Sequence, residues 1–157
     1  MISQRARYAF KALIVLARAG GAGMQIRDIA EKERIPRKFL EQILLQLKAN
    51  GLVDSRRGRS GGYHLVADPQ AISVSQVLRI VDGPIAPLTC ISRTAYARCR
   101  DCPDETHCAV RRLFAETYAA TLARLETTTL ATALVAEPAM AAAEPLAPRP
   151  LALVDAI

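Results

Sequence analysis

Apolar residues recur every three or four positions along residues 3–18, which is the period of an amphipathic helix. The stripe comprises Ala6, Ala9, Phe10, Leu13, Leu16 and Ala17. Ser3 is a suitable residue to cap the start of this helix. Glycines at positions 20, 21 and 23 favour its end. The pattern therefore predicts a first helix over residues 3–18.

Two shorter helices are predicted next, separated by a break at Ile35-Pro36. The first covers 24–35, with Ile26, Ile29 and Ala30 facing inward. The residue before a proline avoids the helical region, and proline suits the first turn of a new helix. The second runs from Pro36 to about Asn50, and its inward residues are Phe39, Leu40, Ile43, Leu44 and Leu47. Two helices joined by a tight turn form a helix-turn-helix.

A β-hairpin is predicted immediately after these helices. Residues 52–55 and 63–66 have the composition of short strands, and the segment between them is basic and rich in glycine. A hairpin that follows a helix-turn-helix forms a wing.

Ser73 to Gln76 has the pattern of a capping box, which predicts a helix through about Val81. Another helix is predicted from about His107 to Leu125. The apolar stripe of this helix comprises Val110, Leu113, Phe114, Thr117, Thr121 and Leu125. One short helical turn is predicted in 127–134. Nothing in its own half of the chain covers this stripe, so we expect it to form a dimer interface.

These elements predict a mostly α fold with a small β-hairpin wing, a winged helix-turn-helix followed by a long dimerisation helix. The expected organisation is a winged helix-turn-helix domain at 1–83, a cysteine-rich loop at 84–108 and a dimerisation helix at 109–136. Residues 137–157 are rich in alanine and proline without a clear period, which predicts a disordered tail.

The composition is consistent with a helix-rich protein in a reducing compartment. The chain has 157 residues, of which 51% are hydrophobic and only 4% aromatic. Its apolar runs are far shorter than the ~20 residues of a membrane span, and the first residues do not resemble a signal peptide. We therefore expect a cytoplasmic protein that does not enter a membrane and has reduced thiols.

Positive charge is concentrated in the first half of the chain. Residues 1–80 contain 14 Lys/Arg and 6 Asp/Glu, a balance of +8, whereas residues 81–157 contain 7 and 9, a balance of −2. A basic half favours a polyanionic partner such as double-stranded DNA, although charge alone also fits a solvated surface.

The start of the second short helix is the candidate for reading DNA, since the first residues of a recognition helix lie over base edges. Arg37 and Lys38 can pair with phosphates or guanine, and Glu41, with Gln42 behind it, can accept from cytosine. Arginines at a hairpin tip recurrently enter a narrow minor groove. The candidates at this tip are Arg56, Arg57 and Arg59. Weaker candidates for phosphate contacts are Ser3, Arg5, Arg7 and Tyr8, of which Tyr8 fits a core position equally well.

Several patches of the sequence resemble the Rrf2 family of winged-helix regulators over roughly residues 1–135. They are Arg7-Tyr-Ala9, Ile29-Ala30, Phe39 to Ile43, Leu47 to Val53, Arg57-Gly58, Gly61-Gly-Tyr63 and Val81-Asp82. The resemblance implies a homodimeric transcription factor. It also implies that Glu41 contributes to base readout and that Arg57 enters the minor groove.

All four cysteines of the chain lie in one stretch of nineteen residues with the spacing C-x8-C-x2-C-x5-C. Clustered thiolates are soft ligands that suit an iron–sulfur cluster, zinc or copper(I). Only one C-x2-C pair occurs, whereas structural zinc sites commonly use two. A zinc site, a thiol–disulfide switch and simple packing nevertheless remain alternatives.

The resemblance favours a cluster, because cluster-binding members of the family use three cysteines of this loop for a [2Fe-2S] or [4Fe-4S] cluster. By position these are Cys90, Cys102 and Cys108. The sequence departs from the family pattern in having Cys99 as well, and in having Arg111 where some members place a histidine. We expect Cys99 to be the fourth ligand. His107 and a residue of the other subunit are the alternatives.

The sequence thus predicts a regulator, in the form of a repressor, whose operator binding is controlled by an iron–sulfur cluster that senses iron, redox state or nitric oxide. A zinc- or thiol-controlled regulator of the same fold is one alternative. A regulator that docks a partner enzyme is another. An electron-transfer or cluster-carrier protein is a third, but it would not need the basic wing. No nucleophile–base pair, phosphate loop or paired carboxylates indicate an enzyme.

Overall fold

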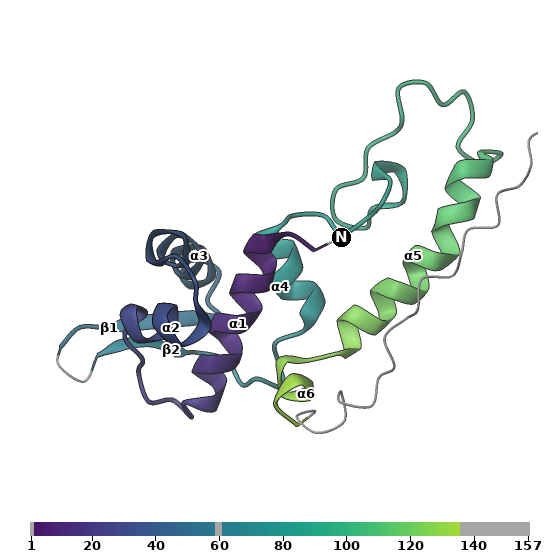
Figure 1. Cartoon of the computed structure of the whole chain (residues 1–157). Helices are drawn as coiled ribbons and strands as arrows, with labels where there is room; N and C mark the ends of the chain where they lie inside the picture. The colour runs from purple at the N-terminus through teal and green to yellow at the C-terminus, as the bar shows by residue number, and fades with distance from the viewer. Residues whose placement is uncertain (1, 59–60, 136–157) are drawn as a thin grey trace, which may run out of the picture.

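The computed structural model describes residues 2–58 and 61–135. In Figure 1 helices α1 to α4 and a two-stranded hairpin form one half of the molecule, and the long helix α5 extends along the other. The elements are α1 (Gln4–Arg18), α2 (Ile26–Glu33), α3 (Arg37–Ala49), β1 (Val53–Arg56), β2 (Gly62–Leu65), α4 (Val74–Val81), a 3₁₀ turn η1 (Thr89–Ile91), α5 (Ala109–Thr127) and α6 (Leu130–Val135). The predicted fold class is confirmed.

The first and fourth helices begin at the serine caps that the sequence predicts. The Ser3 hydroxyl accepts a hydrogen bond from the Ala6 amide at 3.0 Å, and the Ser73 hydroxyl accepts from the Gln76 amide at 3.1 Å. Each bond satisfies an amide that has no partner within its helix. Pro36 is the N-cap of α3 and not its first residue, a shift of one position.

The core of the winged half forms where α1 packs on α2, α3, α4 and β2. Its largest fully buried side chains in this half are aliphatic: Leu13, Leu16, Ile29, Leu40, Ile43, Leu44 and Leu47. Burial of a leucine-sized side chain contributes about 1.5–3 kcal/mol. The core therefore fixes which face of α3 points outward.

The hairpin pairs antiparallel with Val53 opposite Leu65 and Arg56 opposite Gly62. Its base is also bonded to the segment before α2, because Met24 and Tyr63 exchange two backbone hydrogen bonds of 2.9 Å. The sequence did not indicate this third strand-like contact. It anchors the wing on two sides.

Helix α5 begins at Ala109, so His107 lies in the loop before it and not in the helix. Leu122 is the buried residue of α5 in the single chain, whereas Val110 and Leu113 are 53% and 71% exposed. The following short helix α6 returns to α1, with Leu130 buried in the core. This return was not expected, since the sequence indicated only a short helical turn there.

None of the helices in the described ranges is long and apolar enough to cross a membrane. The cytoplasmic location stays a prediction. The predicted tail at 137–157 lies outside the described residues.

Candidate nucleic-acid interface and cysteine site

The outer face of α3 carries the four side chains that the sequence marked for reading DNA. Arg37, Lys38, Glu41 and Gln42 are all exposed, while Leu40, Ile43, Leu44 and Leu47 are buried on the opposite face. Because residues three and four apart share a helix face, the four polar side chains form one continuous surface. The helical spacing of the buried residues of α3 thus determines that these four polar side chains point outward.

The wing presents exposed arginines next to α3. Arg56 and Arg57 are exposed at the end of β1, whereas Arg59 lies outside the described residues. The base of the wing is fixed to α3 by Lys48, which lies 2.8 Å from an Asp54 carboxylate oxygen and donates to the Ser55 hydroxyl at 2.7 Å. The hydrogen bond from Lys48 lowers the pKa of Asp54 below its ordinary value.

Three of the four weaker candidates at the start of α1 are already engaged within the chain, the exception being Arg5. The Ser3 hydroxyl caps α1 and donates to the Asp82 carboxylate. Arg5 is half-buried, and the Tyr8 ring packs edge-on against Phe39 with centroids 5.8 Å apart. Arg7 is exposed and donates to Gln4. Tyr8 therefore occupies a position at the rim of the core, the alternative that the sequence left open.

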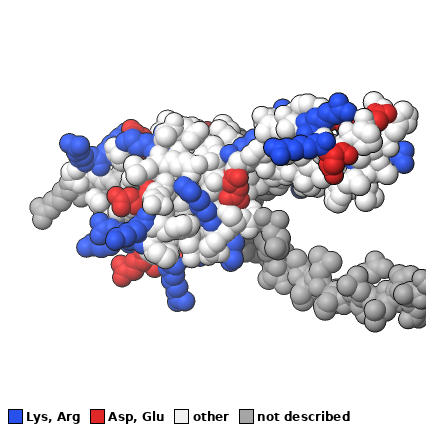
Figure 2. All heavy atoms as spheres, turned by 90° about the horizontal axis from the view of Figure 1, so that it is seen from above, with Lys and Arg blue, Asp and Glu red and all other residues white. Residues whose placement is uncertain are grey.

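Figure 2 shows basic side chains projecting from the winged half of the molecule, at the end where the hairpin lies. The surface around α5 and the cysteine loop bears both signs of charge in the same view. This distribution follows the balance of +8 in residues 1–80.

All four cysteines line one cavity of about 260 Å³ at the start of α5. Cys90 belongs to the turn η1, Cys99 and Cys102 to the loop, and Cys108 is the N-cap of α5. Leu88, Pro103 and Val110 add apolar walls. No group of three or more histidine, cysteine or acidic side chains among the described residues has its atoms within reach of one metal ion. The sulfurs therefore share a cavity but do not converge on one point.

The surroundings raise the pKa of two of the thiols and lower the pKa of a third. A hydrogen bond with the Cys90 thiol is the main cause that raises the pKa of Cys99. Burial, followed by a hydrogen bond with Cys108, raises the pKa of Cys102. The Arg111 amide, 3.4 Å from the Cys108 sulfur, lowers the pKa of Cys108. Four soft donors at one cavity, one of them with its pKa lowered by the amides of a helix start, fit a soft metal or an iron–sulfur cluster.

Charged side chains fix the walls of this cavity. Arg111 lies 2.7 Å from a Glu105 carboxylate oxygen, and the Tyr96 hydroxyl donates to the same carboxylate at 2.9 Å. This hydrogen bond raises the pKa of Tyr96. Arg98 donates to the carbonyls of Cys102 and Pro103 at 3.2 and 3.0 Å. The loop is therefore held by polar bonds that the sequence spacing did not reveal.

His107 points away from the cysteines. Its side chain is 87% exposed, and its Nδ1 lies 2.5 Å from an Asp104 carboxylate oxygen. Hydrogen bonds from Thr106 and His107 lower the pKa of Asp104 to about 2. His107 does not line the cavity, whereas Cys99 and Arg111 do. Within the chain, Cys99 has the better position to be a fourth ligand.

Comparison with known proteins gives one consistent result. Residues 2–136 match the model of the Rrf2 family, described as an iron-dependent transcriptional regulator. An rrf2-like HTH-type transcriptional regulator of Rhodobacter capsulatus is 46% identical over 140 residues, covering 87% of this chain and 93% of the relative. The HTH-type transcriptional regulator IscR of Escherichia coli is 37% identical over 90 residues, covering 57% of this chain and 56% of IscR.

A solved structure extends the similarity to the fold. CymR, described as the global cysteine regulator of Bacillus subtilis, superposes with a TM-score of 0.70 at 31% identity, covering 85% of this chain and 95% of that chain. The family is one of transcriptional regulators and not of enzymes, and its helix-turn-helix binds DNA. The chain belongs to the Rrf2 family of winged-helix transcriptional regulators.

Proposed function

We propose that this chain is a homodimeric cytoplasmic repressor whose binding to an operator in double-stranded DNA is controlled by an iron–sulfur cluster. The ligands are Cys90, Cys99, Cys102 and Cys108. The observation that carries the proposal is that all four line one cavity formed by the loop and the start of the long helix α5. The proposal divides the chain into a DNA-binding domain at 1–83, a cofactor loop at 84–108 and a dimerisation helix at 109–136.

The DNA-reading surface consists of the outer face of α3 and the wing. Arg37, Lys38, Glu41 and Gln42 enter the major groove, because all four are exposed on one face at the start of α3. The three arginines at positions 56, 57 and 59 follow the minor groove. Arg5 supplies a phosphate contact from the start of α1, with smaller contributions from Ser3 and Tyr8, which already have partners in the chain.

A cluster fits the cavity better than a single zinc ion does. Zinc requires four sulfurs within about 2.3 Å of one point, whereas here the thiols surround a cavity of about 260 Å³. A cluster does not require all four sulfurs to meet at one atom, because its several irons share the cysteine ligands. A bound [2Fe-2S] or [4Fe-4S] cluster supplies a redox-active cross-link that is sensitive to iron supply and nitric oxide.

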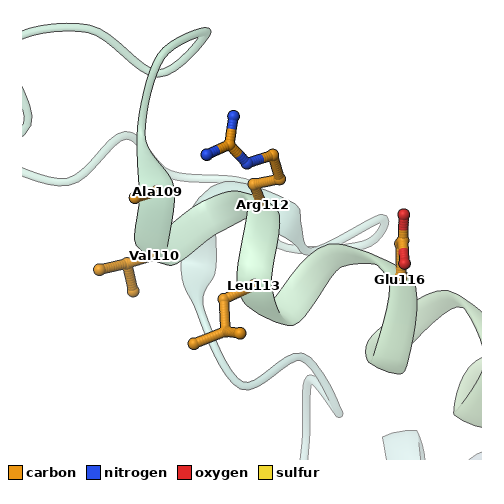
Figure 3. A pocket seen from close by; sticks show the side chains of 5 residues that line it. All are labelled: Ala109, Val110, Arg112, Leu113 and Glu116. Carbon is orange, nitrogen blue, oxygen red and sulfur yellow. The ribbon is translucent and has the colours of Figure 1, made fainter.

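The apolar stripe of α5 supports a dimer. A shallow hollow of about 520 Å³ at the start of α5 is lined by Ala109, Val110, Arg112, Leu113 and Glu116. In Figure 3 Val110 and Leu113 project to the same side of the helix. Pairing of two such helices covers this surface and holds two α3 helices for half-sites about one turn of DNA apart.

A change in the ligation of the cysteines would be transmitted to α5. Cys108 is the N-cap of α5, so a change in the bonds of its sulfur acts directly on the start of the dimer helix. Release of the cysteines frees the loop between the winged half and α5, and this changes the spacing of the two α3 helices. DNA affinity then depends on whether that spacing matches the operator.

The experiment is anaerobic purification of the wild type and of Cys99→Ala, Cys102→Ala and Cys108→Ala, followed by absorption spectra and iron, sulfide and zinc analysis. We expect iron and sulfide in the wild type and their loss in all three variants. His107→Ala is the matched control, because its ring is exposed and faces Asp104, and it should retain full iron content.

Operator binding by the same proteins completes the test. Loss of iron should change affinity for the operator at least tenfold, within the range of allosteric coupling energies of about 1–3 kcal/mol. A colourless protein that contains zinc would show that the cysteines bind zinc and not an iron–sulfur cluster. Affinity that does not respond to loss of the cysteines would remove the sensing role, and absence of salt-sensitive DNA binding would favour a carrier protein.

A further inference from the structure

Leu45 is an exposed leucine in the middle of the outer face of α3. It is 54% exposed, although the leucine before it is fully buried. It lies four residues after Glu41, three after Gln42 and seven after Lys38, so all four side chains share one face. The apolar side chain therefore lies among the polar residues of the proposed reading surface.

Neither the core nor the wing accounts for an apolar residue at this position. The buried stripe of α3 consists of Leu40, Ile43, Leu44 and Leu47, on the other side of the helix. Lys48 lies on the outer side one turn further along, but it is drawn to Asp54 and Ser55 at the base of the wing. Leu45 is consequently the exposed side chain of the third turn that is free to contact a base edge.

The major groove offers one apolar group to such a side chain, the 5-methyl group of thymine. The base edges of the other nucleotides present hydrogen-bonding groups, which leucine cannot satisfy. We propose that Leu45 is a specificity-determining residue that contacts the thymine methyl group of one A·T base pair in each operator half-site. This inference rests on the proposed entry of α3 into the major groove.

The geometry also fixes where that base pair lies. Leu45 follows Glu41 by about one turn of helix, so it contacts a base pair adjacent to the one that Glu41 reads. A symmetric operator therefore contains two such thymines, one in each half-site. Substitution of leucine by a smaller residue lowers the preference for thymine at that position and leaves the other positions unchanged.

The test uses an operator selected from random duplexes with the full-length holoprotein. Each thymine of the half-site is replaced in turn by uracil, which lacks only the methyl group, and the affinities of wild type and Leu45→Ala are compared. For the wild type we expect one position per half-site where uracil lowers affinity on the order of fourfold, the value of one buried methyl group. Leu45→Ala should bind the thymine and uracil duplexes equally at that position.

Two controls separate this inference from the proposed function. Val135→Ala removes an exposed apolar side chain from α6 and should keep the full thymine preference. Glu41→Ala should weaken operator binding if α3 reads DNA at all. If Glu41→Ala weakens binding but no position distinguishes wild type from Leu45→Ala, or if the selected half-site has no thymine, the role of Leu45 is wrong. If Glu41→Ala binds normally, the proposed reading surface itself is wrong.

Discussion

Gly62 is the residue at which the wing meets the rest of the winged half. Its φ is +139°, and a Cβ added there would lie 2.4 Å from the Met24 carbonyl carbon. That approach allows Tyr63 and Met24 to exchange their two backbone hydrogen bonds. Any side chain would push the hairpin away from the segment before α2. Glycine is therefore required at this position on two independent grounds, backbone conformation and space.

Gly62→Ala should lower the free energy of unfolding by about 3 kcal/mol, since an unfavourable φ costs about 1–3 kcal/mol and the contact with Met24 is also lost. Gly51→Ala is the matched control. Its φ is +73°, but a Cβ there would meet nothing within 4 Å, so we expect a loss of about 1 kcal/mol. Urea denaturation measures both. Equal losses would show that the contact with Met24 does not stabilise the wing.

At this scale the sequence predicts exposure well and long-range contacts poorly. The exposure of Arg37 and Glu41 follows from the helical period, because the buried positions of the same helix fix the opposite face. The motif Gly61-Gly62 was visible, but its partner Met24 lies far away along the chain. Local pattern contains no information about which distant backbone approaches a glycine.

Helix α5 is an element with two apolar sides and only one of them covered. Leu122 packs towards the winged half, where α5 contacts α4 and η1. Val110, Leu113 and Phe114 form the second side, and all three are exposed. An apolar stripe of this kind on a helix that stands apart from the core is typical of an interface.

Leu113→Glu should convert the proposed dimer into a monomer, because a charge buried between two helices without a partner costs several kcal/mol. Light scattering coupled to size exclusion measures the mass, and operator affinity should fall at least tenfold when the two half-sites are no longer bound together. Ala119→Glu adds the same charge to an exposed position on the other side of α5 and should leave the dimer intact. A dimeric Leu113→Glu protein would exclude this stripe as the interface.

The predicted helices agree with the structure within a few residues, because local residues at the ends of each helix determine where it begins and stops. Ser3 and Ser73 cap their helices, and the break before Pro36 is set by sterics of the backbone. The short helix α6 was not expected to return to the core, since its six residues have no independent stability. Leu130 holds it there through tertiary packing, which a short window of sequence cannot reveal.

The cysteine cluster was evident from spacing, but its cavity and the bonds of Arg98 and Arg111 were not.

At the scale of the whole molecule, the two halves are joined at the end of α5. The Val74 amide donates to the Thr128 carbonyl at 2.9 Å, and the Leu130 amide donates to the Ile72 carbonyl at 2.8 Å. Next to this junction, one Glu126 carboxylate lies 3.0 Å from the Arg79 guanidinium of α4 and 3.8 Å from that of Arg93 in the cysteine loop. Glu126 therefore bridges the loop and the winged half from the end of α5.

Glu126→Gln should weaken the response of DNA affinity to the state of the cysteine site without removing DNA binding. Partly exposed ion pairs contribute at most about 1 kcal/mol, so the ratio of affinities with and without metal should fall by a factor of about two to five. Gel-shift titrations of both forms measure the ratio. Glu31→Gln removes an exposed carboxylate of α2, outside both this junction and the proposed dimer surface, and should leave the ratio unchanged. If both variants keep the wild-type ratio, the response passes through the backbone hydrogen bonds of Val74 and Leu130 and the packing of α5 on α4, which the Glu126 substitution leaves in place.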